Sequence, residues 1–348
     1  MAAIETVSTR RVRAARPARI RTASRRRLAR PLLVRALPRE GARLLDDYDR
    51  PLYPLTVPRH RSRYQPVDDF EARFEEFQKI FETPDALHSR GHLFIVTGDR
   101  GYGKTSMRQR CAFWTHTEYD QKNGEIAVID LSGEDWETET VDQRLYRVRR
   151  WILKGLVGRL EPSDIALIDT NVDIEESFHD LGVMLRTRGI AQNRPMPIVL
   201  FVLLPGYPSS EELKRYYGLA REGMVFMAEI FHPDVIQDIT RKIEIERDGF
   251  NNRNNVYTHI LRLGVLKVGD DDLLMTWMQA DVPNCPGLTN SEVRAKVQKL
   301  IQEKKISASQ FMKLLIGALK VAMVDQAAEV TVDHVIQYYQ DRIYSSAD

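Results

Sequence analysis

The chain has 348 residues, of which 43% are hydrophobic and 29% are charged, and its formal net charge is +2. This length predicts about two domains with sizeable cores. Cys111 and Cys285 are the two cysteines; they are too few to form a disulfide framework or a zinc site, so a reducing, cytoplasmic compartment is expected. Since no apolar run approaches the roughly 20 residues that span a bilayer, no membrane partner is expected.

Residues 1–45 carry a marked charge asymmetry. Thirteen arginines stand there against Glu5 and Glu40, a net charge of +11, which leaves −9 for the rest of the chain. This tail mixes Arg, Ala, Pro and Ser without a sustained apolar stripe, and we predict that it is disordered in isolation. Three interpretations stay open: an arm that binds DNA or another polyanion, an organelle transit peptide, or no function, as a solvated appendage or as residues read from a start codon placed too far upstream.

Residues 46–66 are predicted to form an extended lead-in, because four prolines interrupt them. Asp68 or Asp69 then caps a helix. Its apolar residues recur at helical spacing and indicate a face that packs beside the next domain; they are Phe70, Phe74, Phe77, Ile80 and Phe81.

A glycine-rich loop follows the apolar strand at residues 92–97. It reads G-x-x-x-x-G-K-T and consists of Gly98, Asp99, Arg100, Gly101, Tyr102, Gly103, Lys104 and Thr105. A helix is predicted from Lys104 to about residue 118 and includes Ser106. A loop between a strand and a helix is typical of sites whose backbone N–H groups wrap a polyphosphate, with the positive end of the helix behind them. Lys104 is expected to reach the phosphates, and the Thr105 hydroxyl to ligate Mg²⁺.

The remaining elements indicate two domains. Strands are predicted at residues 126–131, 198–204, 224–231 and 257–263, with helices at 141–160 and 175–188 between them. This alternation favours an α/β domain over residues 67–266, with a parallel sheet covered by helices on both faces. Residues 267–348 are predicted to be all helical, with helices at 270–279, 289–304, 307–326 and 331–344, and with capping boxes that begin at Thr289 and Ser307.

With these motifs, residues 66–345 resemble the AAA+ and related STAND-type ATPases, which are P-loop NTPases. The glycine loop carries the resemblance. Residues 257–266 look like a final core strand that leads into a lid, and residues 318–322 with 330–335 look like the end of a helical lid. The resemblance implies an α/β domain followed by a small helical lid, ATP and Mg²⁺ as cofactors, and a homo-oligomer or another protein partner.

One departure concerns the acidic residues that such ATPases carry at the end of the third core strand. Here the best candidate strand, residues 198–204, ends in Leu203, Leu204 and Pro205, which cannot ligate a metal or accept a proton. Asp169, after an apolar run, and Asp130, at the end of the neighbouring predicted strand, are the alternative candidates for a catalytic acid.

The resemblance also implies arginines that contact phosphate. Arg294, near the start of a lid helix, is the candidate for a lid arginine, and Arg241, Arg247 or Arg253 is the candidate for an arginine that acts on a neighbouring subunit. Glu229, within an apolar strand, is a candidate polar sensor; that it faces the edge of the sheet or pairs with an arginine are the open alternatives.

Two functions follow from the resemblance. The first is an AAA+-like ATPase, or a slow ATP-dependent switch, that controls a macromolecular assembly and reaches DNA through the basic tail. The second is a non-hydrolysing regulatory module of the STAND type. A phosphotransferase is disfavoured because the sequence shows no acceptor site. Loss of the acids that orient water slows phosphoryl transfer by orders of magnitude while the loop still binds phosphate, so ATP binding with slow or absent hydrolysis is expected.

Overall fold

In the computed structural model, the described residues all belong to the second of two units of the chain, Ala36–Asp348. The described residues are 45, 48, 50–82, 90–121, 126–134, 138–157, 178, 199–206, 208–230, 235, 237–238, 241, 256–288 and 290–345. The predicted tail up to residue 44 and most of the helix predicted at 175–188 therefore lie outside them. Among the described helices, none has the length and apolar character needed to cross a membrane.

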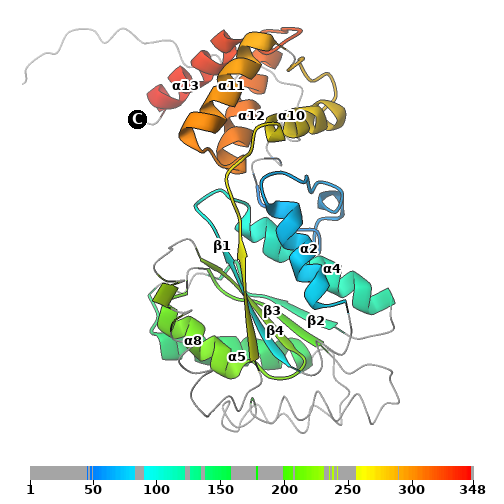
Figure 1. Ribbon diagram of the computed structural model, residues 1–348, viewed down its shortest axis with the longest axis vertical. Coiled ribbons are helices and arrows are strands. Elements are labelled where there is room, and N and C mark those ends of the chain that lie inside the picture. Colours follow the sequence, from blue (N-terminus) through cyan, green and yellow to red (C-terminus); the bar gives the residue numbers. More distant parts are fainter. Residues whose placement is uncertain are drawn as a thin grey trace, which may run out of the picture. The chain divides into compact units, whose positions relative to one another are not determined.

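The α/β part contains a five-stranded sheet in the order β2-β3-β4-β1-β5 (Figure 1). Its strands are β1 (Gly91–Thr97), β2 (Ile126–Asp130), β3 (Val199–Leu203), β4 (Met224–Ile230) and β5 (Val256–Arg262). Each strand pair is parallel, which confirms the predicted sheet. All residues of β1, β3 and β4 are buried, because strands in a sheet covered on both faces are shielded from water on each side.

Helices cover the two faces of the sheet (Figure 1). On one face lie α2 (Phe70–Ile80) and α4 (Lys104–Gln121), whose apolar side chains pack with Phe94 and Val96 of β1. On the other face lie α5 (Val141–Val157) and α8 (Ser210–Leu219), which pack with Leu93 and Ile95. Successive side chains of β1 thus enter different cores, because side chains alternate along a strand.

Helix α8 is missing from the sequence prediction. The Ser209 hydroxyl caps it by accepting a hydrogen bond from the Glu212 backbone N–H at 3.2 Å. The side chains of Leu213 and Tyr216 are buried against the sheet. A serine cap ahead of apolar residues three apart was the available signal for this helix.

The C-terminal part is all helical, as predicted. Its helices are α10 (Asp270–Asp281), α11 (Ser291–Lys304), α12 (Ala308–Val324) and α13 (Val332–Ser345), and they share an apolar core. The capping box at Ser307 is confirmed. The box predicted at Thr289 is wrong: Asn290 caps α11 instead, through hydrogen bonds from the Glu292 and Val293 backbone N–H groups, and asparagine is a strong N-cap residue.

The lead-in differs from the extended segment predicted. It contains a short 3-10 helix, η2 (Pro58–His60), and the His60 Nδ1 accepts a hydrogen bond from the Tyr53 backbone N–H at 2.9 Å. Tyr48 of the lead-in is buried in the core of the C-terminal helices, together with the flanking residues Leu45 and Val67. Packing against these helices therefore orders the lead-in, an effect that proline spacing does not reveal.

Candidate nucleotide-binding site

The glycine loop lies between the C-terminal end of β1 and the first turn of α4. Gly98, Gly101 and Gly103 have φ angles of +150°, +89° and +80°. Side chains with a Cβ rarely adopt these angles, so the loop conformation depends on glycine. Backbone N–H groups of such a loop, together with the four free N–H groups of a helix N-terminus, suit an anion.

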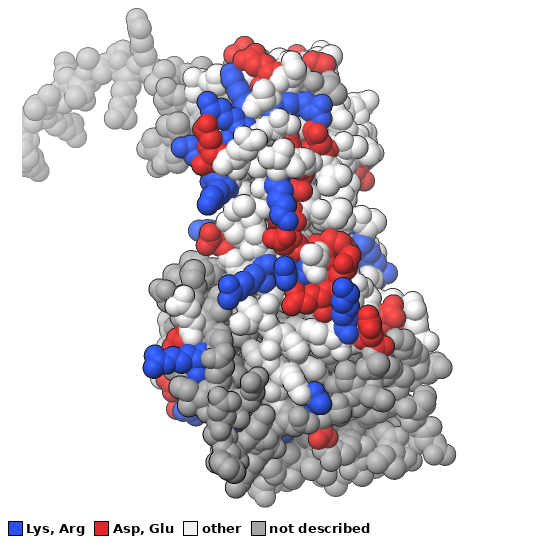
Figure 2. Space-filling model, viewed as in Figure 1, with Lys and Arg blue, Asp and Glu red and all other residues white. Residues whose placement is uncertain are grey.

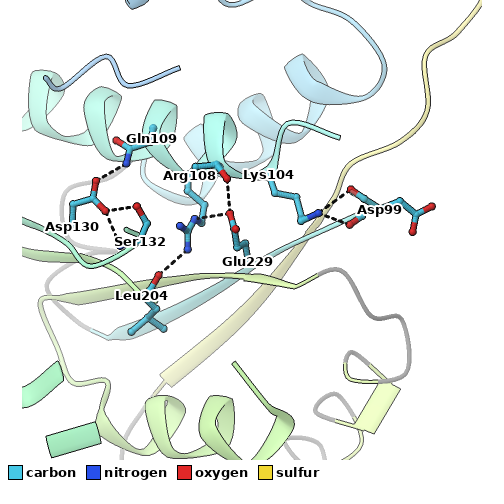
Figure 3. A network of polar contacts seen from close by, with 10 residues as sticks. Asp99, Lys104, Arg108, Gln109, Asp130, Ser132, Leu204 and Glu229 are labelled. Atoms are coloured by element: carbon cyan, nitrogen blue, oxygen red, sulfur yellow. Dashed lines mark hydrogen bonds and ion pairs between the residues drawn. The ribbon is translucent and has the colours of Figure 1, made fainter. Parts of the chain in front are cut away.

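Backbone carbonyl groups of the glycine loop hold the side chain of Lys104 in place. The ammonium Nζ donates to the carbonyl oxygens of Gly98 at 2.7 Å and Asp99 at 2.8 Å (Figure 3). Burial lowers the pKa of Lys104, while the carboxylate of Glu229 acts in the opposite direction. A positive charge is thus positioned beside the loop before any phosphate arrives.

Thr105 and Glu229 are joined by a hydrogen bond, in which the Thr105 hydroxyl donates to Glu229 Oε2 at 2.9 Å. The same carboxylate oxygen lies 3.4 Å from Arg108 Nε, and Arg108 Nη1 donates to the Leu204 carbonyl oxygen at 2.9 Å (Figure 3). Arg108 is 1% exposed and Glu229 is 8% exposed. A buried ion pair therefore spans α4, β3 and β4 next to the loop.

Glu229 occupies a position that the sequence analysis did not connect with Thr105. It lies on β4, which pairs directly with β1 in the register Val96 with Glu229, whereas β3 is one strand further away. The end of β3 is apolar, as the sequence indicates. The signal for Glu229 was a single acid within an otherwise apolar strand, and only the strand order brings it to Thr105.

The donor set at this position fits Mg²⁺. This ion prefers oxygen ligands and commonly takes one or two protein groups together with phosphate oxygens and waters. Thr105 supplies a hydroxyl and Glu229 a carboxylate. Among the described residues no group of three or more His, Cys, Asp or Glu side chains forms a metal cluster, so phosphate and water would have to complete the coordination.

A cavity of about 710 Å³ opens beside the loop. It is lined by the glycine loop with the start of α4, by the lead-in and the start of α2, by Glu229 of β4, and by the C-terminal helices α10 and α12. The predicted binding residues that line the cavity are Arg100, Gly101, Tyr102, Gly103, Lys104, Thr105 and Ser106. Tyr64, Phe70, Leu274, Trp277 and Met312 contribute apolar wall. A large pocket with a few convergent polar groups suits a small-molecule ligand.

The C-terminal helices contact the glycine loop directly. The Ser309 backbone N–H donates to the Gly101 carbonyl oxygen at 3.2 Å. On the lead-in side, the Leu52 backbone N–H donates to Ser106 Oγ at 3.0 Å. The loop is thus tied to the C-terminal helices, and the first turn of α4 to the lead-in.

Comparisons with known proteins identify the fold. No family model matches the chain, and no curated protein matches it. Among solved structures, the Aeropyrum pernix ORC1 protein in complex with DNA is similar, with a TM-score of 0.53 and 14% identity over 83% of this chain and 69% of that chain. The fold is that of the AAA+ P-loop ATPases. Drosophila ORC bound to DNA has a TM-score of 0.49 and 16% identity, over 93% of this chain and 71% of that chain.

Within this AAA+ fold, Asp130 lies at the end of the edge strand β2. Its carboxylate accepts hydrogen bonds from Gln109 Nε2 at 2.6 Å and from the Ser132 backbone N–H at 2.9 Å. It does not line the cavity. Asp169 lies outside the described residues, so its catalytic role stays a prediction.

The two candidate arginines that the structure describes, Arg294 and Arg241, do not line the cavity. Arg294 of α11 forms an ion pair with Asp272 of α10, and Arg294 is not among the residues that line the cavity. Arg241 does not line the cavity either, and Arg247 and Arg253 lie outside the described residues. For Arg294 or Arg241 a role at the phosphates requires a movement of the lid or a neighbouring subunit, and the roles of all four arginines stay predictions.

Asp68 lines the cavity at the start of α2 and has a buried oxygen, Oδ1, without a hydrogen-bond partner. Burial raises the pKa of Asp68 from its ordinary 3.8 to about 7. Because ionisation is disfavoured in the folded state, the stabilisation from protonated Asp68 is present below pH 3.8 and is lost as the pH rises to 7.

We therefore expect Asp68→Asn to remove part of the pH dependence of stability. Between pH 4.5 and pH 8, the free energy of unfolding of the wild type should fall by roughly 2–3 kcal/mol relative to the variant, allowing for partial solvent screening. Urea unfolding of both proteins across this range measures the difference. Parallel curves would show that Asp68 has the same pKa in the folded and unfolded states.

Proposed function

We propose that this protein is an ATP-binding switch with the AAA+ fold that controls a macromolecular assembly, with Mg²⁺ as cofactor and with slow or absent hydrolysis. The observation that carries the proposal is the cavity beside Lys104, combined with the apolar end of β3. The loop has the groups that bind a triphosphate. The strand that would orient an attacking water has none of the required acids.

The residues have defined roles in this proposal. The backbone N–H groups of residues 98–105 wrap the phosphates, and Lys104 exchanges a carbonyl partner for phosphate oxygen. Thr105, with Glu229 behind it, holds Mg²⁺, which offsets phosphate charge when bound. The apolar wall shields the remainder of the nucleotide from water.

Binding and turnover measured on one preparation test this function. Calorimetry should detect ATP binding in the presence of Mg²⁺. Phosphate release should stay at least about a hundredfold below the 1 s⁻¹ at the low end of ordinary enzyme turnover. Brisk phosphate release that Lys104→Ala abolishes would contradict the slow-turnover part, and the absence of ATP binding would contradict the whole proposal.

DNA association is proposed through the basic tail. The solved ORC1 structure that shares the fold is a complex with DNA. On the face in Figure 2, acidic and basic side chains of the described C-terminal helices are interspersed, so the described surface on this face offers no single-sign track for a phosphate backbone. Removing residues 1–35, which keeps the buried Leu45, should therefore flatten the salt dependence of DNA affinity. An unchanged slope would exclude the arm.

A homo-oligomer or a protein partner is part of the same proposal, because none of the described lid residues that line the cavity is an arginine. A STAND-type regulatory module that binds nucleotide without hydrolysis is the second candidate. The apolar end of β3 favours it, and undetectable turnover with retained ATP affinity would support it.

A further inference from the structure

A permanent positive charge is buried behind the glycine loop, outside the residues that line the cavity. Arg108 lies one helical turn after Lys104 on α4 and is 1% exposed. An arginine side chain cannot lose its proton at neutral pH, so its charge has to be balanced inside the protein. Glu229 balances it, with Arg108 Nε 3.4 Å from Glu229 Oε2.

This ion pair lies next to Thr105, the expected Mg²⁺ ligand. The oxygen of Glu229 that faces Arg108 also accepts the hydrogen bond from Thr105, the hydroxyl expected to ligate Mg²⁺. Arg108 also reaches the Leu204 carbonyl oxygen at 2.9 Å, at the apolar end of β3. The Arg108 guanidinium thus lies between Leu204, which follows β3, and Glu229 of β4 (Figure 3).

Because Glu229 and Arg108 carry charges of opposite sign, they have opposite effects on the binding of a metal-free triphosphate. Glu229 alone would repel the phosphates and attract Mg²⁺, whereas Arg108 alone would attract the phosphates and repel Mg²⁺. Both fields reach the loop: the carboxylate raises the pKa of Lys104 and the guanidinium lowers it. Because the pair is buried, water screens these effects less than it would at the surface.

We propose that Arg108 is a resident counter-ion of Glu229, and that the balance within this pair sets how strongly nucleotide affinity depends on Mg²⁺. The inference rests on the proposed ATP-binding function. In the wild type the two charges offset each other, so the protein binds ATP in the absence of metal as well as in its presence, and Mg²⁺ improves affinity only moderately.

The experiment measures the ratio of two ATP dissociation constants by calorimetry: the value in EDTA divided by the value in excess Mg²⁺. Arg108→Met replaces the guanidinium with an apolar chain of similar length and leaves Glu229 uncompensated. The ratio should rise about tenfold. Glu229→Gln keeps the shape of the side chain and leaves Arg108 uncompensated, so the ratio should fall about tenfold, within the range expected when a group behind a metal ligand is altered.

Two further variants separate charge balance from damage to the fold. The double variant with Arg108→Met and Glu229→Gln has no unpaired charge at this position, and its ratio should return to near the wild-type value. Glu212→Gln is the matched control: Glu212 is a buried glutamate paired with an arginine, Arg144, at 3.3 Å, and it does not line the cavity. It should leave the ratio unchanged.

The outcomes distinguish the inference from the function on which it rests. A wild type that binds no ATP in either condition overturns the proposed function. A wild type that binds ATP, with single variants whose ratios stay at the wild-type value or move in the same direction, overturns the inference alone. A simple loss of stability would weaken binding in both conditions together and would not move the ratio in opposite directions.

Discussion

Replacing Lys104 with alanine is expected to weaken ATP binding at least about a hundredfold while the protein remains folded. The Lys104 ammonium is already directed at the loop by the carbonyl oxygens of Gly98 and Asp99, at 2.7 and 2.8 Å. Each charged hydrogen bond is worth about 1.5–3 kcal/mol, so two lost phosphate bonds correspond to about 3 kcal/mol and a factor of roughly 100. Calorimetric titration with ATP and Mg²⁺ measures the loss.

The fold should tolerate this change because burial already opposes the charge on Lys104 and lowers its pKa. The thermal unfolding temperature of the variant should therefore stay near that of the wild type in the absence of nucleotide. Lys296→Ala is the matched control, since Lys296 is exposed and pairs only with Glu292 on its own helix among the described ion pairs. Equal ATP affinity in both variants would show that the loop is not the phosphate site.

Replacing Gly101 with valine is expected to weaken ATP binding about tenfold or more and to release α12 from the loop. At φ = +89° a side chain is strained at a cost of about 1–3 kcal/mol. A Cβ at residue 101 would also lie 2.7 Å from Ser307 Oγ and 3.0 Å from Ser309 Cβ. The collision displaces the hydrogen bond from the Ser309 N–H to the Gly101 carbonyl oxygen.

Hydrogen exchange at the Ser309 amide reports this release directly, because that amide should lose protection in Gly101→Val. Gly269→Val separates strain from collision: Gly269 has φ = +100°, and a Cβ there would meet no atom within 4 Å. This control should keep the ATP affinity and the Ser309 protection of the wild type. Retained protection at Ser309 in Gly101→Val would show that the contact does not hold the lid on the loop.

The local sequence by itself determined the parts of the site that lie close together along the chain. The strand, the glycine loop and the first turn of α4 form one continuous segment, and the Lys104 ammonium bonds to carbonyls five and six residues before it. Helix caps follow the same logic, since the box at Ser307 joins residues three positions apart. Such interactions depend on short-range backbone geometry, which residue type and spacing specify.

The tertiary structure alone decided which distant groups complete the site. Glu229 reaches Thr105 across 124 positions, because β4 rather than β3 pairs with β1. Arginine side chains are mostly exposed to solvent, but Arg108 becomes the counter-ion of Glu229 because α4 packs on the sheet. The contact of Ser309 with Gly101 and the burial of Leu45 in the helical core likewise join segments far apart in sequence. Strand order and helix packing create these neighbours, and a single chain's periodicity carries no information on either.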